Sequence, residues 1–210
     1  MKFDAVIWDW NGTLLNDVVV VVETINQLLS DRNLPQLTVG KYLDVFTFPV
    51  RDYYSKIGFD FQNEPFEIPA LQFITIYNEV VTLCGLYDEV VPVLTGFQNR
   101  GIRQFILSAM EQDQLVKTVC YNGISHFFDD LCGLDNHYAH SKVDNGKLLI
   151  RNNNLNPDRT LLVGDTIHDF EVARSIGCSC ILIANGHQSK ARLLSTGARV
   201  VDNLNQIKFS

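Results

Sequence analysis

The sequence predicts an α/β protein: a Rossmann-like parallel sheet flanked by helices, with an inserted all-helical subdomain. Short runs that are apolar on both faces recur along the chain and alternate with helical patterns, as expected for a sheet built from βαβ units. Glycines occupy predicted turns from helix to strand, where helices commonly end. One long helical interval interrupts this alternation directly after the first strand.

The apolar runs predict strands at 3–8, 103–107, 160–163, 180–183 and 199–201. Helical patterns occupy 88–100, 112–121, 145–153, 167–176 and 189–194, and turn glycines follow three of these helices, at Gly101, Gly177 and Gly197. Because each strand is followed by a helix, the strands are expected to run parallel, with their carboxyl ends at one edge of the sheet.

No strand is expected between the first run and residue 103. The interval between them indicates helices at 18–30, 39–46, 50–57 and 66–83. We therefore expect a core of residues 1–16 and 85–210 and a helical cap of residues 17–84. Since ligands of open α/β sheets bind beyond the carboxyl ends of the strands, the cap is expected to cover that edge as a lid. The valines of 18–22 are poor helix formers, so a strand there stays open as an alternative.

The composition narrows the class of partner. The net charge is −7, from 17 basic and 24 acidic residues, which argues against nucleic acid but permits a small phosphorylated metabolite. The N-terminus lacks a signal-peptide pattern and no apolar run is long enough to span a bilayer, so a cytoplasmic protein without a membrane partner is expected. The five scattered cysteines are expected to be reduced thiols. The sequence does not indicate an oligomeric state.

Polar residues follow two of the predicted strands where the chemistry is expected. Asp9 comes directly after the first strand, and Gly12 allows a sharp turn beneath a bound phosphate. Ser108 and Ala109 follow the second strand, where a hydroxyl and backbone N–H groups can hold phosphate oxygens.

A lysine and two further aspartates complete this pattern. Lys142 lies in a polar stretch before a helix. Asp165 follows the strand at 160–163, and Asp169 comes one helical turn later, so the two carboxylates share a face. Two such carboxylates are costly together unless a cation neutralises them. Their order and shared position at one sheet edge favour a catalytic site over separate turn residues.

With these motifs the chain resembles the haloacid dehalogenase superfamily, most closely its phosphoglycolate-phosphatase-like branch. The four motifs of that superfamily are similar, in order, to DWNGTLL, FILSA, Lys142 and LLVGDTIHD. The helical interval lies where this branch carries a small cap. The resemblance implies a phosphoric monoester hydrolase acting on a small phosphorylated metabolite, such as phosphoglycolate or a sugar phosphate.

The resemblance also implies the roles of the residues. Asp9 would attack phosphorus and form an aspartyl-phosphate. Mg²⁺ would be held by the carboxylates of Asp9 and Asp165 and the backbone carbonyl of Asn11, with Asp169 supporting the metal or its waters. Lys142 would be the catalytic cation. The residues implied in binding the substrate are Trp10, Gly12, Thr13, Ser108, Ala109 and, from the cap, Arg51.

Asn11 departs from the family pattern, which usually has a second aspartate there as general acid and base. An amide cannot shuttle a proton, so acid–base assistance worth roughly 10²–10⁴-fold would be missing. Asn11 would still contribute its backbone carbonyl to the metal. Four alternatives stay open. The chain could be a slow phosphatase that uses water or a cap residue as the acid, with His140 as another candidate acid, or a phosphonatase-like hydrolase using a cap lysine (Lys41 or Lys56). It could also be a phosphometabolite-binding protein with little turnover, or the Asn11-Gly12 pair could deamidate.

Overall fold

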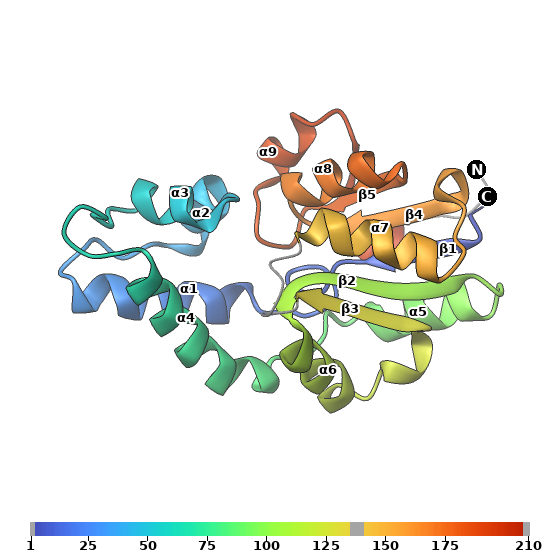
Figure 1. Ribbon diagram of the computed structural model, residues 1–210, viewed down its shortest axis with the longest axis horizontal. Coiled ribbons are helices and arrows are strands. Elements are labelled where there is room, and N and C mark those ends of the chain that lie inside the picture. The colour runs from blue at the N-terminus through green and yellow to red at the C-terminus, as the bar shows by residue number, and fades with distance from the viewer. Residues whose placement is uncertain (1–2, 135–140, 208–210) are drawn as a thin grey trace.

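The computed structural model describes residues 3–134 and 141–207 of the chain. Its centre is a six-stranded parallel sheet in the order β3-β2-β1-β4-β5-β6 (Figure 1). The strands are β1 (Ala5–Trp8), β2 (Arg103–Glu111), β3 (Asp130–Leu134), β4 (Thr160–Gly164), β5 (Ser179–Ile183) and β6 (Arg199–Val201). The predicted α/β fold is confirmed.

The central strand β1 pairs with β2 on one side and β4 on the other. The chain builds β2 and β3 outward in one direction and β4, β5 and β6 in the other, so the strand order reverses at β1. In open α/β sheets such a reversal leaves a crevice beyond the carboxyl ends of the strands, where ligands bind. The topology therefore selects the segments after β1, β2 and β4 as the place for a site.

Two features of the sheet differ from the sequence prediction. Strand β3 was not expected, because its short DLCGL segment is polar at its start and contains a glycine that β-propensity disfavours. It forms because β2 supplies a paired neighbour. Strand β2 continues to Glu111 rather than ending at residue 107, with a register shift against β3 between Leu107 and Glu111.

Helices cover both faces of the sheet, which is why its strands are apolar on both sides (Figure 1). The helices α7 (Lys142–Asn152) and α8 (Ile167–Ile176) pack on the face that includes Ile7 and Leu162. The opposite face, including Val6 and Ile106, packs against α5 (Val90–Gln98) and α6 (Gln112–Tyr121). The remaining helices of this part are α9 (Lys190–Leu194) and the short 3₁₀ turns η2 (Ser125–Phe127), η3 (Pro157–Arg159) and η4 (Leu204–Gln206).

The segment between β1 and α5 is helical and lies beside the sheet (Figure 1). It consists of α1 (Val18–Asp31), α2 (Val39–Val45), α3 (Val50–Lys56), α4 (Glu67–Val80) and η1 (Val81–Leu83). The chain enters and leaves it at neighbouring points, since Asn16 N donates to Gly85 O at 3.0 Å. The strand alternative for 18–22 is wrong: α1 buries one face, including Val22, Ile25 and Leu29, and this packing outweighs the low helix propensity of valine.

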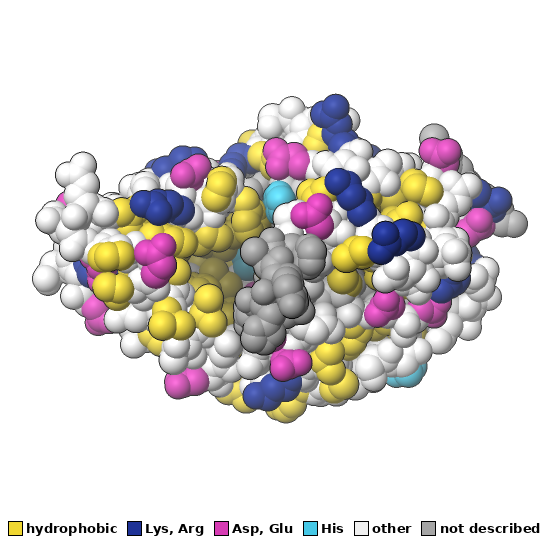
Figure 2. All heavy atoms as spheres, in the orientation of Figure 1, with side chains coloured by type: hydrophobic (Ala, Val, Ile, Leu, Met, Phe, Trp, Pro, Cys, Tyr) yellow, Lys and Arg dark blue, Asp and Glu magenta, His cyan; other side chains and the backbone are white. Residues whose placement is uncertain are grey.

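Hydrophobic side chains are also exposed on this helical segment (Figure 2), including Ile68, Leu71 and Ile74 on α4. Within the described residues, none of the helices is both long and apolar enough to span a membrane. The cysteines form no disulfide.

Candidate active site

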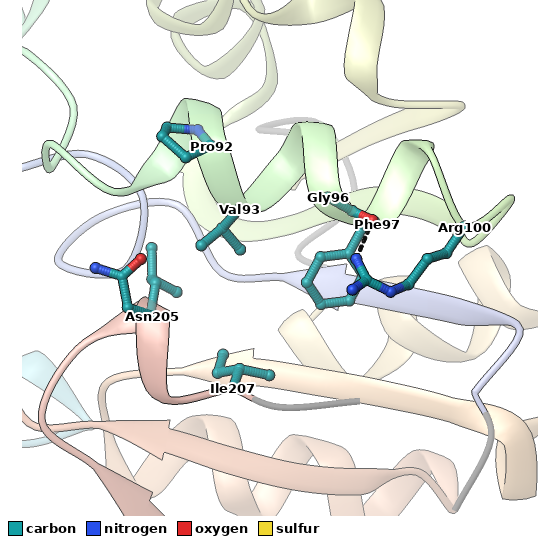
Figure 3. A pocket seen from close by; sticks show the side chains of 8 residues that line it. Pro92, Val93, Gly96, Phe97, Arg100, Asn205 and Ile207 are labelled. Atoms are coloured by element: carbon teal, nitrogen blue, oxygen red, sulfur yellow. Dashed lines mark hydrogen bonds between the residues drawn. The ribbon is translucent and has the colours of Figure 1, made fainter. Parts of the chain in front are cut away.

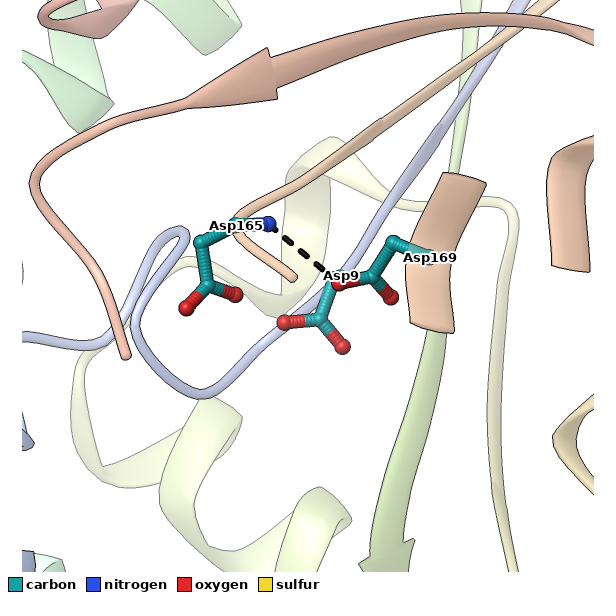
Figure 4. Close-up of side chains that lie close together, drawn as sticks. All are labelled: Asp9, Asp165 and Asp169. Atoms are coloured by element: carbon teal, nitrogen blue, oxygen red, sulfur yellow. Dashed lines mark hydrogen bonds between the residues drawn. The ribbon is translucent and has the colours of Figure 1, made fainter. Parts of the chain in front are cut away.

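Three carboxylates meet at the carboxyl edge of the sheet (Figure 4). Asp9 follows β1, Asp165 follows the adjacent β4, and Asp169 lies in the first turn of α8. One oxygen from each of them lies within 4.8 Å of the others, and all three residues are buried. Parallel pairing places Asp9 and Asp165 side by side, because Trp8 lies opposite Val163 and Asp9 N donates to Val163 O at 2.8 Å.

Lys142 lies between two of these carboxylates. Its Nζ donates to Asp9 Oδ1 at 2.5 Å and to Asp169 Oδ1 at 2.6 Å, and only 5% of its side chain is exposed. The sequence placed Lys142 before a helix that starts at residue 145, but α7 begins at Lys142 itself, because Ser141 and Asp144 form a capping box there. The capping box thus fixes the backbone from which Lys142 reaches Asp9.

The positive charge beside the three aspartates is too small to keep all of their carboxyl groups readily ionised. Burial raises the pKa of Asp9 to about 6, against the attraction of Lys142, and the charge of Asp169 raises it further. Burial also holds the pKa of Asp165 well above its usual range, against the attraction of His187, with Asp9 and Asp169 adding to the rise. For Asp169, Lys142 outweighs burial and lowers the pKa, while the two aspartates keep the pKa of Lys142 raised against its own burial. A further cation near Asp9 and Asp165 would favour their ionised forms.

The donor set fits a divalent metal that prefers oxygen ligands, as Mg²⁺ does. Asp165 is held for such a role by Thr13 Oγ1, which donates to its Oδ1 at 3.1 Å, and by His187 N, which donates to its Oδ2 at 2.5 Å. A side chain at Gly12 would meet Asp165 Oδ2 at 2.5 Å, so only glycine lets the loop approach this closely. The residues present therefore fit a metal held by Asp9 and Asp165.

Asp169 has both carboxylate oxygens engaged in protein contacts. Its Oδ1 accepts from Lys142, and its Oδ2 accepts from the hydroxyl of Thr166 at 2.6 Å and the N–H of Thr166 at 3.0 Å. Asp165 also accepts hydrogen bonds at both oxygens, so these contacts do not separate a metal ligand from a supporting residue. The supporting position of Asp169 stays a prediction.

The predicted phosphate-binding residues meet different partners. Ser108 is fully buried one residue beyond the level of Asp9, and its Oγ accepts from Met110 N at 3.0 Å, which leaves its hydroxyl hydrogen available. The hydroxyl of Thr13 donates to Asp165, and the N–H of Gly12 donates to Asp17 Oδ1 at 2.9 Å. The Trp10 side chain is buried in the hydrophobic core.

Two other predicted residues are not brought into the cluster by any described contact. Arg51 stacks its guanidinium over the rings of Phe61 and Phe66, at 5.2 and 5.9 Å from their centroids, and stays exposed within the helical segment. Ala109 continues β2 and is half-buried. Binding of substrate by either residue stays a prediction, and His140 lies outside the described residues.

Sequence reasoning missed a buried network beside the aspartates. Asp17 and His187 form an ion pair, with Asp17 Oδ1 at 3.2 Å from His187 Nε2. Burial opposes protonation of His187, but the carboxylate of Asp17 outweighs it and raises the pKa of His187 to about 9. In the sequence, Asp17 stands out only as the first residue of the predicted cap. His187 lies shortly after β5, so its position at the carboxyl edge was the one available signal.

A separate cavity of about 370 Å³ lies between α5 and the segment around η4 (Figure 3). Its lining includes Pro92, Val93, Arg100 and Ile207, and none of the described lining residues carries a carboxylate. It shares no lining residue with the aspartate cluster.

The doubly wound α/β fold thus gathers buried carboxylates and a lysine at its switch point, where folds of this class bind ligands. The chain belongs to the haloacid dehalogenase-like hydrolase family, whose model matches residues 6–183. It is 23% identical to a phosphoglycolate phosphatase of Pasteurella multocida over 89% of this chain and 88% of that protein. It is 22% identical to an N-acetylmuramic acid 6-phosphate phosphatase of Pseudomonas aeruginosa, over 89% and 84% of the two chains.

Solved structures share the fold over nearly the whole chain. A haloacid dehalogenase-like hydrolase from Bacteroides fragilis superposes with a TM-score of 0.86 at 17% identity, covering 99% of this chain and 100% of that one. CbbY from Rhodobacter sphaeroides, in complex with phosphate, gives 0.74 at 15% identity and covers 98% and 96%. The family and the relatives identify the chain as an enzyme, a phosphoric monoester hydrolase of the phosphoglycolate-phosphatase-like branch.

Proposed function

We propose that this phosphatase hydrolyses a small phosphorylated metabolite through an aspartyl-phosphate on Asp9, with Mg²⁺ as its metal. The observation that carries the proposal is the short contact of 2.5 Å between the buried Asp9 carboxylate and Lys142 at the switch point of the sheet. A carboxylate there is positioned to act as a nucleophile, and the ammonium group is positioned to offset the charge of a phosphate dianion.

The steps follow from the residues around Asp9. Bound Mg²⁺, held by Asp9, Asp165 and the backbone carbonyl of Asn11, would supply charge neutralisation for the phosphoryl oxygens. An oxygen of Asp9 attacks phosphorus, the bond from phosphorus to the ester oxygen breaks, and the leaving alkoxide takes a proton. Lys142 and the Ser108 hydroxyl hold phosphoryl oxygens during this transfer. Water then cleaves the aspartyl-phosphate, releasing inorganic phosphate and regenerating the Asp9 carboxylate.

Asn11 does not supply the proton for the leaving group. The two hydrogens of its side-chain amide are directed at Asp17 Oδ2, 2.9 Å away, and at the hydroxyl oxygen of Tyr77, 2.7 Å away. Donation to a leaving group would break one of these hydrogen bonds, and an amide has no acidic proton to transfer. We therefore assign that proton to water, which favours substrates with good leaving groups.

We further propose that residues 17–84 are a cap over a core of residues 1–16 and 85–210. Asp9 and Asp165 are only 6% and 1% exposed, so a substrate reaches them only if covering residues move. Contacts between the two parts include Gln188 Nε2 donating to Phe46 O at 3.1 Å and the ring of Phe48 lying 4.9 Å from that of His168. Relatives named as phosphatases of phosphoglycolate and N-acetylmuramic acid 6-phosphate support a small phosphorylated substrate. The net charge of −7 argues against nucleic acid as the partner.

The alternative functions are less favoured. A phosphonatase-like reaction needs a cap lysine at the substrate, whereas Lys41 and Lys56 are both exposed. The matched relatives are phosphatases rather than binding proteins.

The test is phosphate release with Mg²⁺ across a panel of aryl and alkyl phosphate esters, run beside Asp9→Asn. We expect release that depends on Asp9 and is faster on aryl esters. Tight binding of esters without Asp9-dependent release would refute the proposal.

A further inference from the structure

Asp17 is a buried carboxylate that accepts several hydrogen bonds beside the loop after β1. Its Oδ1 accepts from Gly12 N at 2.9 Å and lies 3.2 Å from His187 Nε2. Its Oδ2 accepts from Asn11 Nδ2 at 2.9 Å and from the Tyr77 hydroxyl at 2.5 Å. The residue is completely buried. Its donors thus come from the loop after β1, from α4 and from the segment after β5.

The ordinary explanation for this aspartate does not apply. An aspartate directly before a helix usually caps it, by accepting from an N–H of the first turn. Asp17 precedes α1 but makes no such hydrogen bond. The carboxylate instead turns toward Asn11 and Gly12. A buried carboxylate that forgoes the cap and receives these other donors is placed to organise the loop.

The same network joins the helical segment to the core. His187 Nδ1 lies 2.9 Å from the hydroxyl of Tyr42 on α2, while Tyr77 on α4 contacts both Asp17 and Asn11. Tyr42 and Tyr77 are 0% and 8% exposed. Separation of α2 and α4 from the core would remove both tyrosine hydroxyls from these partners. The buried Asp17–His187 ion pair therefore contacts both the loop after β1 and two docked helices.

We propose that Asp17 and His187 are positioning residues that hold Asn11 and Gly12 in the catalytic geometry when α2 and α4 are docked. Asp17 and Asn11 act as a matched carboxylate and amide, so that this corner contains one negative charge and not two. The effect on turnover rests on the proposed phosphatase function, whereas the coupling between the two residues does not.

A matched pair has a distinctive consequence for Asn11→Asp. That substitution would place a second carboxylate where an amide now donates to Asp17 at 2.9 Å. Like charges at such a distance in a buried site disfavour the folded arrangement. Asn11→Asp alone should therefore not raise kcat, although it introduces a carboxyl group that could act as a general acid. The exchange Asn11→Asp with Asp17→Asn restores one carboxylate and one amide, and so restores the hydrogen bond.

The experiment is a double-mutant cycle that compares Asn11→Asp, Asp17→Asn and the double variant carrying both substitutions. Tm is measured for each protein, and kcat and KM are measured on an aryl phosphate with Mg²⁺ at a temperature well below every Tm. The control is Glu64→Gln, which weakens the ion pair between Arg32 Nε and Glu64 Oε2, 2.7 Å apart within the helical segment. We expect each single variant to lower kcat by roughly 100-fold with a smaller change in KM, as for displaced catalytic groups. The exchange should recover much of both kcat and Tm. Glu64→Gln should lower Tm alone.

The proposal is overturned if Asp17→Asn behaves like Glu64→Gln, with a lower Tm and an unchanged kcat, or if the effects of the single substitutions simply add in the exchange. Tyr77→Phe provides a milder variant should Asp17→Asn not fold, and it should lower kcat with the fold intact; an unchanged kcat would also overturn the proposal. If the wild-type enzyme releases no phosphate from any ester, the proposed function fails. The changes in Tm across the cycle still test the coupling between Asn11 and Asp17, because additive changes would contradict it.

Discussion

Replacing Lys142 by methionine removes the ammonium group that lies between Asp9 and Asp169, at 2.5 and 2.6 Å, while preserving a long apolar stem. Both carboxylates are buried, so no solvent replaces the lost cation. Breaking a buried pair by removing one partner costs about 3–5 kcal/mol. For a chain of this length a loss of 1 kcal/mol lowers Tm by about 2–4 °C, so the variant should melt roughly 6–20 °C lower.

The loss should depend on pH in a defined direction. The pKa of Asp9 is about 6 in the folded protein against 3.8 as its ordinary value, so the folded state holds a proton that the unfolded state releases. Such a group lowers stability as the pH rises from the ordinary value through the folded pKa. Without Lys142 that pKa rises further. The variant should therefore lose less stability at about pH 5, where Asp9 is protonated, than at about pH 8.

Thermal unfolding in EDTA at both pH values measures this difference. Lys147→Met is the matched control, since Lys147 is exposed on the same helix and should shift Tm little. An equal loss for Lys142→Met at the two pH values would refute the electrostatic reasoning, and a loss no larger than that of the control would refute the buried ion pair.

Three further outcomes follow from the site. Asp165→Asn should melt at or above the wild-type temperature in EDTA, because burial and its neighbours already hold the pKa of Asp165 well above its usual range. Added Mg²⁺ should not stabilise this variant, whereas it should stabilise the wild-type protein by about 2.7 kcal/mol at a concentration of 100 Kd. Gly12→Ala should lower Tm more than Gly197→Ala, since both glycines have positive φ (72° and 75°) but only a Cβ at Gly12 meets Asp165 and His187, each at 2.5 Å; equal shifts in Tm would contradict this. Arg51→Ala should leave KM unchanged if Arg51 keeps its stacking on Phe61, whereas a raised KM in steady-state assays would show that it reaches the substrate.

Much of the fold was predictable because its signals are local. The strands β1, β4, β5 and β6 and the helices α6 and α8 lie at or close to their expected positions, since apolar runs, caps and turn glycines act within a few residues. Strand β3 was missed, because its five residues lack a strong pattern and depend on pairing with β2. The start of α7 was placed three residues late, because the capping box at Ser141 was overlooked.

The candidate site divides in the same way. The sequence alone indicated that Asp9, Asp165 and Asp169 belong at one edge of the sheet, because parallel strands place their carboxyl ends together and these residues come just after predicted strands. Lys142 follows no predicted strand, and its place in the site was implied by the family resemblance. Only the tertiary structure decided that Lys142 bridges two of these carboxylates and that Asn11 gives its amide hydrogens to Asp17 and Tyr77. Those contacts join residues as many as 133 positions apart. No local pattern encodes such a distance; packing of the helices on the sheet sets it.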